Sequence, residues 1–172
     1  GLVSLAGLST ANNLEDNQGK YLGLGNYLST QGLSGTYSSY ADISPNIWQL
    51  AYVRNGEILR YDAFIELDEN GFFNTMILRE TEGKEEILGG YGYCLENYCH
   101  LSTTIDDNAF EETITFLENN RIKRVGSLRY YDEDGNEQSM RWTERLAEMN
   151  LLFNSSMELP WTPATNPHKK SE

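Results

Sequence analysis

Residues 87–105 read ILGGYGYCLENYCHLSTTI, in which two strand-like runs flank a short link and a cysteine closes the run on each side. A two-residue turn at Glu96-Asn97 places Cys94 directly opposite Cys99. This pair would be a non-hydrogen-bonded pair, whose Cα atoms come to ~4.5 Å, near the short end of disulfide geometry. The stretch therefore predicts a β-hairpin with a Cys94–Cys99 disulfide beside its turn.

The alternative for Cys94 and Cys99 is a pair of free, buried thiols, as is usual in reducing compartments. A zinc site does not fit, because four intervening residues are not zinc spacing and the chain has no other cysteine. A disulfide implies an oxidising compartment, so we expect a secreted or periplasmic protein. A lipid-anchored envelope protein is a variant of the same expectation.

Similar hairpins are predicted on both sides of this stretch. Asn55-Gly56, Asn70-Gly71 and Asp134-Gly135 are strong turn signals, because these residue types tolerate positive φ. Apolar and charged residues alternate over 57–67, which is typical of a strand with one buried face. The whole pattern predicts about eight consecutive strands with tight turns. They lie at 33–40, 48–54, 57–67, 72–80, within 87–105, and at 110–117, 121–131 and 137–145.

The short links leave no room for crossover helices, so the predicted fold is all-β, an antiparallel up-and-down meander. We expect it to close into a barrel, since an open meander exposes two edge strands. Residues 33–153 form the predicted barrel domain, between an N-terminal arm over 1–32 and a Pro-rich C-terminal tail over 154–172. Apolar residues at helical spacing from Thr143 to Phe153 predict a short amphipathic helix.

Composition excludes several classes of partner. The formal net charge of -13 argues against nucleic acid and against binding to anionic membranes through charge. No apolar run reaches the length of a transmembrane helix, so we expect no transmembrane segment. Eleven Tyr, six Phe and three Trp suit strands and the lining of a ligand cavity.

The predicted barrel resembles the calycin superfamily, the lipocalins and their bacterial relatives, at the level of architecture. The lipocalin entry motif is Gly-x-Trp, capped by an Arg from the end of the barrel. Gly35-Thr36-Tyr37 stands in the entry position, with Tyr in place of Trp, and Arg141 or Arg145 could cap it. The resemblance implies a lipocalin-like barrel that holds an acidic apolar ligand in its interior.

The predicted binding site is the barrel interior. Arg124 shares a strand face with Ile122, Leu128 and Tyr130, so its guanidinium would point inward. An inward guanidinium needs a partner, which is either a protein carboxylate or the carboxylate of a ligand. The alternatives are a bulge that turns Arg124 outward, or a filled barrel without a cavity. The expected ligand-binding residues are Tyr61, Tyr91, Tyr93, Arg124, Tyr130, Met140 and Trp142.

No motif for catalysis, cofactor or metal stands out. His100 and Ser102 share a strand face, but a catalytic pair also needs an orienting group and an oxyanion hole. The acidic run over 132–137 lacks EF-hand spacing, and a plain hairpin turn explains it better than Ca²⁺. We therefore expect no cofactor, no metal and no catalytic residue.

The sequence favours non-catalytic binding of a small apolar or amphipathic ligand inside a secreted or periplasmic barrel. Two alternatives stay open. One is an envelope interaction or inhibitor protein that meets a protein partner through its acidic surface. The other is a barrel enzyme, such as an isomerase or a hydrolase.

Overall fold

The computed structural model describes residues 13–54, 57–81 and 83–149, most of which lie in β-strands. In chain order the elements are α2 (Asn13–Asp16), β1 (Gly19–Ser29), β2 (Ser34–Ile43), β3 (Ile47–Arg54), β4 (Glu57–Ile65), β5 (Phe72–Thr81), β6 (Lys84–Leu95), β7 (Tyr98–Ile105), β8 (Asn108–Leu117), β9 (Arg121–Tyr131) and β10 (Glu137–Glu148). The predicted all-β fold class is confirmed.

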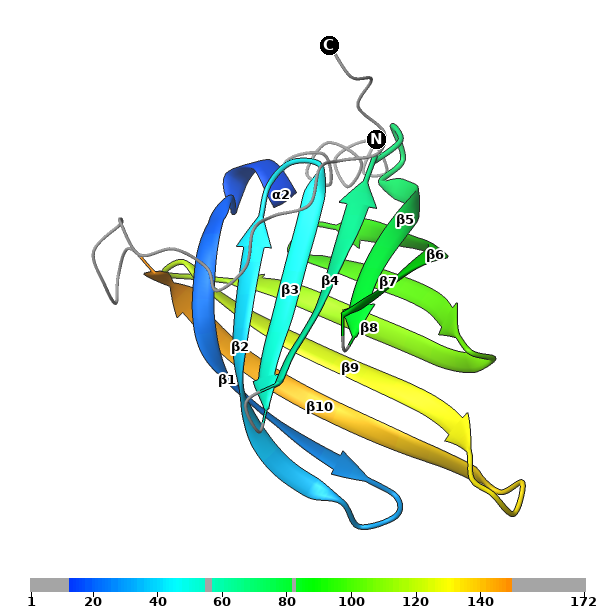
Figure 1. Ribbon diagram of the computed structural model, residues 1–172. Coiled ribbons are helices and arrows are strands. Elements are labelled where there is room, and N and C mark those ends of the chain that lie inside the picture. Colours follow the sequence, from blue (N-terminus) through cyan, green and yellow to red (C-terminus); the bar gives the residue numbers. More distant parts are fainter. Residues whose placement is uncertain (1–12, 55–56, 82, 150–172) are drawn as a thin grey trace.

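These strands form one closed barrel (Figure 1). Each strand pairs antiparallel with its neighbours along the chain, and β1 pairs with β10 to close the sheet. The up-and-down meander and its closure are therefore confirmed. No helix among the described residues is long and apolar enough to cross a membrane.

The strand count of about eight is wrong, because the barrel has ten strands. The predicted ranges correspond to β2–β10, with the hairpin at 87–105 supplying two strands, and the strand that they lack is β1, whose residues Gly19–Ser29 were expected to belong to the N-terminal arm. On this strand Leu24 and Leu28 are 70% and 62% exposed, while Gly25 is buried. The two leucines face outward and a glycine faces inward between the buried Tyr21 and Tyr27, so the alternation of hydrophobicity along β1 does not identify its inner face.

The predicted C-terminal helix is corrected over Thr143–Glu148, which continues β10. Glu144 and Leu146 are buried on alternate positions, as one face of a strand requires. The spacing of Leu146 and Met149 fits a helix equally well, which explains the wrong prediction. Met149 follows the strand as the last described residue, and residues 150–153 of the predicted helix lie outside the described residues.

The turns follow the predicted chemistry. Asp106, Asp107, Asn119 and Asn120 all have φ between 49° and 66°. Asp106 and Asp107 alone connect Ile105 to its partner Asn108, and two successive residues at positive φ are the signature of the two-residue type I′ turn. The β8–β9 link, 118–120, is one residue longer, and Asn119 and Asn120 supply its positive φ angles. These four residues therefore fix the β7–β8 and β8–β9 hairpins. The Asn55-Gly56 turn lies outside the described residues.

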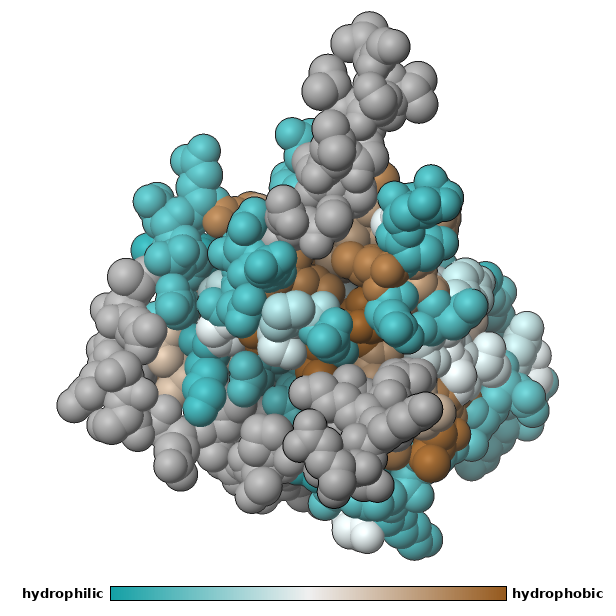
Figure 2. All heavy atoms as spheres, turned by 90° about the horizontal axis from the view of Figure 1, so that it is seen from above, coloured by the Kyte–Doolittle hydropathy of each residue, from teal (hydrophilic) through white to brown (hydrophobic). Residues whose placement is uncertain are grey.

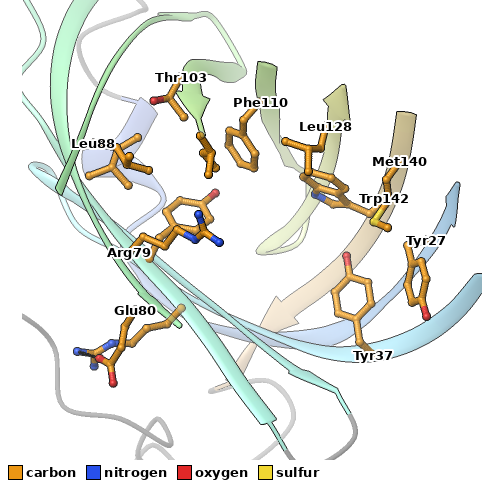
Figure 3. A pocket seen from close by; sticks show the side chains of 14 residues that line it. Tyr27, Tyr37, Arg79, Glu80, Leu88, Thr103, Phe110, Leu128, Met140 and Trp142 are labelled. Atoms are coloured by element: carbon orange, nitrogen blue, oxygen red, sulfur yellow. Dashed lines mark ion pairs between the residues drawn. The ribbon is translucent and has the colours of Figure 1, made fainter. Parts of the chain in front are cut away.

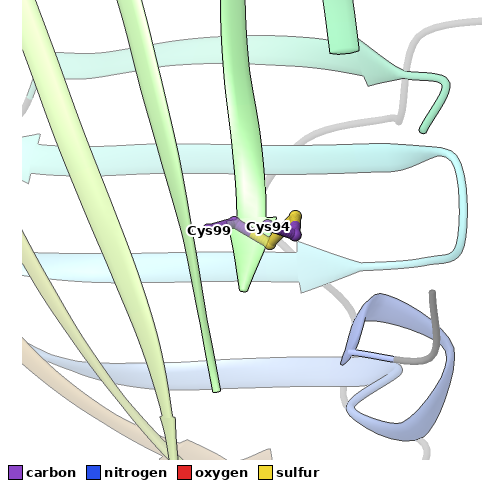
Figure 4. Close-up of a disulfide and its surroundings, with 2 residues drawn as sticks. All are labelled: Cys94 and Cys99. Atoms are coloured by element: carbon purple, nitrogen blue, oxygen red, sulfur yellow. A yellow bond between two sulfur atoms is a disulfide. The ribbon is translucent and has the colours of Figure 1, made fainter. Parts of the chain in front are cut away.

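The predicted disulfide is confirmed. Cys94 on β6 and Cys99 on β7 are cross-strand partners with Cα atoms 4.0 Å apart, and their sulfur atoms are bonded (Figure 4). Both cysteines are fully buried on the inner face of the barrel. The bridge encloses only the β6–β7 turn, so it fixes the register of this hairpin more than it constrains the unfolded chain.

The barrel interior differs between its two ends. The end that carries α2, at the top of Figure 1, is packed by hydrophobic side chains, and Leu14 of α2 belongs to the same cluster as Trp48, Ile65 and Leu146. Seen from this end, many of the visible described side chains are hydrophilic, with hydrophobic ones between them (Figure 2). We call this the α2 end and the opposite one the pocket end.

Candidate functional site

A pocket of about 280 Å³ lies inside the barrel at the pocket end (Figure 3). Its wall is built mainly from aromatic and aliphatic side chains on β1, on β2 and on β4 to β10. The lining residues are Tyr27, Tyr37, Arg60, Tyr61, Ile77, Arg79, Glu80, Leu88, Thr103, Ile105, Phe110, Leu128, Met140 and Trp142. Three of the predicted ligand-binding residues, Tyr61, Met140 and Trp142, are among them.

Three aromatic rings of this wall lie against glycines of the neighbouring strand. Trp142 pairs with Gly126 across β9 and β10, and a Cβ added to Gly126 would overlap its indole ring. Tyr37 lies over Gly25 in the same way, and Tyr27 lies over Gly35. Glycines inside strands leave space for a neighbouring ring, so these pairs set the width of the pocket.

Replacing Gly126 by Val should therefore destabilise the barrel by about 1–3 kcal/mol, because the new side chain displaces Trp142 in a packed wall. Urea denaturation measures the change. Gly89→Val on β6 is the matched control: it is also a strand glycine, but no heavy atom lies within 4 Å of its Cβ position. An equal loss in both variants would contradict the proposed role of Gly126.

Charged residues of β4, β5 and β6 lie at one side of the pocket rim. Arg60 pairs with Glu80 at 2.8 Å, and Arg79 pairs with Glu86 at 3.5 Å, both across neighbouring strands. The guanidinium of Arg79 points towards the space between the labelled lining residues (Figure 3). Its side chain is 32% exposed, so solvent screens this ion pair.

A buried charged layer separates the pocket from the packed α2 end. Glu112, Arg124 and Glu144 lie on the neighbouring strands β8, β9 and β10, and their side chains are fully buried. Arg124 Nε lies 3.2 Å from Glu112 Oε1, and the same guanidinium pairs with Glu144. Tyr61, which lines the pocket, donates a hydrogen bond of 2.5 Å to Glu112. We call these three charged residues the acid–arginine cluster.

The position of this cluster follows from the strand alternation. Along the inner face of β8 and β10, the pocket residues Phe110 and Trp142 come two residues before Glu112 and Glu144. On β10 the core residue Leu146 comes two residues after Glu144. The acid–arginine cluster therefore lies between the pocket floor and the hydrophobic core.

Burial shifts the ionisation of groups in this layer. It raises the pKa of the Glu144 carboxyl to about 7; the Arg124 guanidinium opposes the rise and the Glu112 carboxylate adds to it. Burial also raises the pKa of the Tyr37 hydroxyl, and the Glu144 carboxylate adds to that rise. Two carboxylates that share one cation in a dry site cannot both ionise easily.

The question of the partner of Arg124 is settled by this geometry. Its guanidinium faces inward as predicted, but protein carboxylates hold it and it is not a lining residue of the pocket. Of the two alternatives open in the sequence, a protein carboxylate is the correct one. Tyr130 also lies away from the pocket lining, where its hydroxyl donates to Gln31 at 2.5 Å.

Tyr91 and Tyr93 are corrected, because they lie on the outer face of β6. Tyr91 is 65% exposed, and the ring of Tyr93 stacks on His100 with centroids 5.5 Å apart. Cys94 and Gly92 occupy the inner face instead, and successive side chains of a strand point to opposite faces. The prediction placed both tyrosines on one face correctly, but that face is the outer one.

The His100–Ser102 pair does not form a catalytic triad. Ser102 Oγ lies 3.3 Å from His100 Nε2, and Glu111 approaches that same nitrogen at 3.9 Å. Thr113 occupies Nδ1, where a triad needs its orienting carboxylate. The whole group lies on the outer face of the barrel, away from the pocket.

The acidic run is a turn. Asp132 Oδ1 accepts hydrogen bonds from the backbone N–H groups of Asp134 and Asn136. These bonds lower the pKa of Asp132, after the larger effect of its hydrogen bond from Gln138. Within the described ranges, no group of His, Cys, Asp and Glu side chains could hold a metal ion.

The pocket residues that sequence reasoning missed are mainly Tyr27, Tyr37, Arg79, Phe110 and Leu128. Tyr37 was noted only as the aromatic residue of a possible entry motif. Tyr27 belongs to the unrecognised strand β1. The signal that could have found both is the spacing of glycines and rings on consecutive strands, Gly25 with Tyr27 and Gly35 with Tyr37.

Fold and site together define a closed, ten-stranded, antiparallel up-and-down β-barrel with an aromatic pocket at one end and a buried charged layer below it. No family model matches the chain, and no curated protein matches it.

Proposed function

We propose that the barrel binds a small apolar or amphipathic molecule in its pocket, without catalysis. The observation that carries the proposal is a pocket of about 280 Å³ with Tyr, Trp, Phe, Leu and Met side chains in its wall. Ligand pockets are usually apolar cavities with a few polar groups, and this volume lies just below their usual range of about 300–1,000 Å³. The ligand is therefore small.

The polar groups of the pocket support binding rather than chemistry. Glu112 and Glu144, the carboxylates below the pocket floor, are fully buried and are not lining residues, and the one carboxylate in the lining, Glu80, is paired with Arg60 at 2.8 Å. A general base has to reach the proton that it abstracts, directly or through one water. Tyr37 and Tyr61 supply the hydroxyls of the floor, which can orient a ligand.

The location of the protein is part of the same proposal. A disulfide between two fully buried cysteines, Cys94 and Cys99, supports a secreted or periplasmic protein, with or without a lipid anchor. We also propose that the barrel is calycin-like in architecture, which its closed up-and-down topology and its interior pocket support.

A protein-interaction role is the second candidate. Phe72, Ile87 and Tyr91 on β5 and β6 are 58%, 66% and 65% exposed, which favours contact with a partner on the outer face. The net charge of -13 would select a basic partner.

The test uses naphthalenemethanol, a rigid neutral amphipath, titrated by calorimetry into the wild type and two variants. Leu128→Trp fills the pocket and should weaken binding at least tenfold, that is by about 1.4 kcal/mol or more. Val125→Trp is the matched control, because Val125 lies on the same strand but faces outward and is 41% exposed. Its affinity should equal that of the wild type.

Native mass spectrometry of freshly purified protein supplies an independent measurement. A co-purifying small molecule that is absent from Leu128→Trp would support the proposal. If the wild type neither carries a molecule nor binds the probe at micromolar concentration, ligand binding is overturned and the interaction role becomes the leading candidate.

A further inference from the structure

The acid–arginine cluster contains one positive group and two groups that can be negative. Arg124 contacts both Glu112 and Glu144, and all three side chains are fully buried. With both carboxylates ionised, the layer would carry a net charge of -1 without access to water. An uncompensated buried charge is costly, and binding a proton is the usual way to remove it.

The neighbours of Glu112 and Glu144 come from five strands, β1, β2, β4, β8 and β9, and Arg124 is the cation among them. Gly25 on β1 lies against Glu144, and the hydroxyl of Ser39 on β2 lowers the pKa of that carboxyl slightly against the effect of burial. The remaining groups are Tyr37 on β2, Tyr61 on β4, Glu112 on β8 and Arg124 on β9. The hydroxyls can share hydrogen bonds, but they cannot neutralise a carboxylate.

We propose that the acid–arginine cluster is a proton-binding site which is linked to the pocket: Glu112 and Glu144 together hold one proton, and an apolar ligand above them tightens its binding. The inference rests on the proposed ligand binding. The proton comes from solvent and converts one carboxylate, Glu144, into a carboxylic acid.

The link between pocket and cluster runs through two tyrosines. Tyr37 and Tyr61 line the pocket, and both also interact with the acid–arginine cluster, Tyr61 through its hydrogen bond to Glu112. An apolar ligand excludes water from the space above these rings. Burial is the main reason why Glu144 holds a proton near neutral pH, and losing more water strengthens that effect.

If the ligand-bound protein holds the proton more tightly than the free protein, binding takes up protons and the affinity falls as pH rises. The barrel then loads its ligand at mildly acidic pH and releases it in more alkaline surroundings.

The test is calorimetry of naphthalenemethanol in two buffers that differ in their ionisation enthalpy, at about pH 7, where Glu144 titrates. The wild type should take up a fraction of a proton per ligand. Its affinity should fall about five- to tenfold between about pH 6 and about pH 8. Glu144→Gln should abolish both effects and still bind the probe.

Glu137→Gln is the matched control: it removes a carboxylate from the same strand, but Glu137 is 56% exposed and pairs only loosely with Arg129 at 3.8 Å. It should keep the wild-type proton uptake. Glu112→Gln should abolish the uptake, because one carboxylate and one guanidinium then balance. This second variant and the wild-type measurement decide the question if Glu144→Gln fails to fold.

The outcomes separate the two proposals. Binding of the probe without proton uptake, or with proton release, overturns the linkage and leaves ligand binding intact. Uptake that persists in Glu144→Gln also overturns it, because the proton then binds elsewhere. Absence of any binding by the wild type overturns the proposed function, and the linkage falls with it.

Discussion

Replacing Arg124 by Ala should lower the free energy of unfolding by about 3–5 kcal/mol, the cost typical of breaking a buried ion pair by removing one partner. The variant leaves Glu112 and Glu144 side by side in the barrel interior, fully buried and without their shared cation. It also leaves a cavity where the guanidinium was. Because most domains are stable by only about 5–15 kcal/mol, much of the variant should be unfolded on mild heating.

The control is Arg129→Ala on the same strand. Arg129 is 63% exposed and lies 3.8 Å from the exposed carboxylate of Glu137, a contact of the kind that contributes at most about 1 kcal/mol. Urea denaturation of both variants provides the comparison. If Arg124→Ala costs no more than Arg129→Ala, Arg124 is not held between two carboxylates in the folded protein.

The fold could be predicted from the sequence because its turns contain residue types that are typical of tight turns. Asn70-Gly71 and Asp134-Gly135 separate alternating runs, and the positive φ of Gly71 and Gly135 shows why those residues stand there. Strand β1 was missed for a physical reason. Its leucines at 24 and 28 face solvent, so the hydrophobic pattern gives no information about which face is buried.

Only part of the pocket lining could be predicted from the sequence, because the lining residues depend on which face of each strand points into the barrel. The β6 tyrosines and glycines alternate, and nothing local says which set faces inward. In a closed barrel the interior has a fixed width, so a ring such as Trp142 requires a glycine, Gly126, on the next strand. The large residue therefore faces inward on β10, where it is Trp142, and outward on β6, where it is Tyr91.

The partners of Arg124 could be identified only from the register of β8, β9 and β10, that is, from which residues pair across these strands. Glu144 is its direct cross-strand neighbour on β10, and Glu112 lies diagonally across from it on β8. The β9–β10 hairpin closes through a five-residue link, 132–136, whose pairing cannot be read from the Asp134-Gly135 signal alone. A single carboxylate far along the next strand was therefore not recognised as a neighbour.

The stability of the barrel should fall as pH rises through neutrality, and Glu144 should supply about 3 kcal/mol of that fall. Burial raises the pKa of Glu144 from 4.5, the value for an exposed carboxyl, to about 7 in the folded protein. Between these pH values the folded state binds the proton and the unfolded state does not. The stabilising contribution is therefore full below about pH 4.5 and is lost as pH rises through about 7.

Glu144→Gln isolates this contribution, because its side chain stays neutral at every pH. Burial also raises the pKa of Asp42, with Lys20 opposing the rise, so the wild-type slope has more than one source. The difference in unfolding free energy between wild type and Glu144→Gln cancels the other sources. Urea denaturation from about pH 5 to about pH 8 should show the wild type losing up to about 3 kcal/mol relative to this variant. Glu137→Gln should run parallel to the wild type, since Glu137 is exposed. A wild type that gains stability over this range relative to Glu144→Gln would mean that Glu144 is ionised in the folded barrel at acidic pH, and that Arg124 outweighs burial.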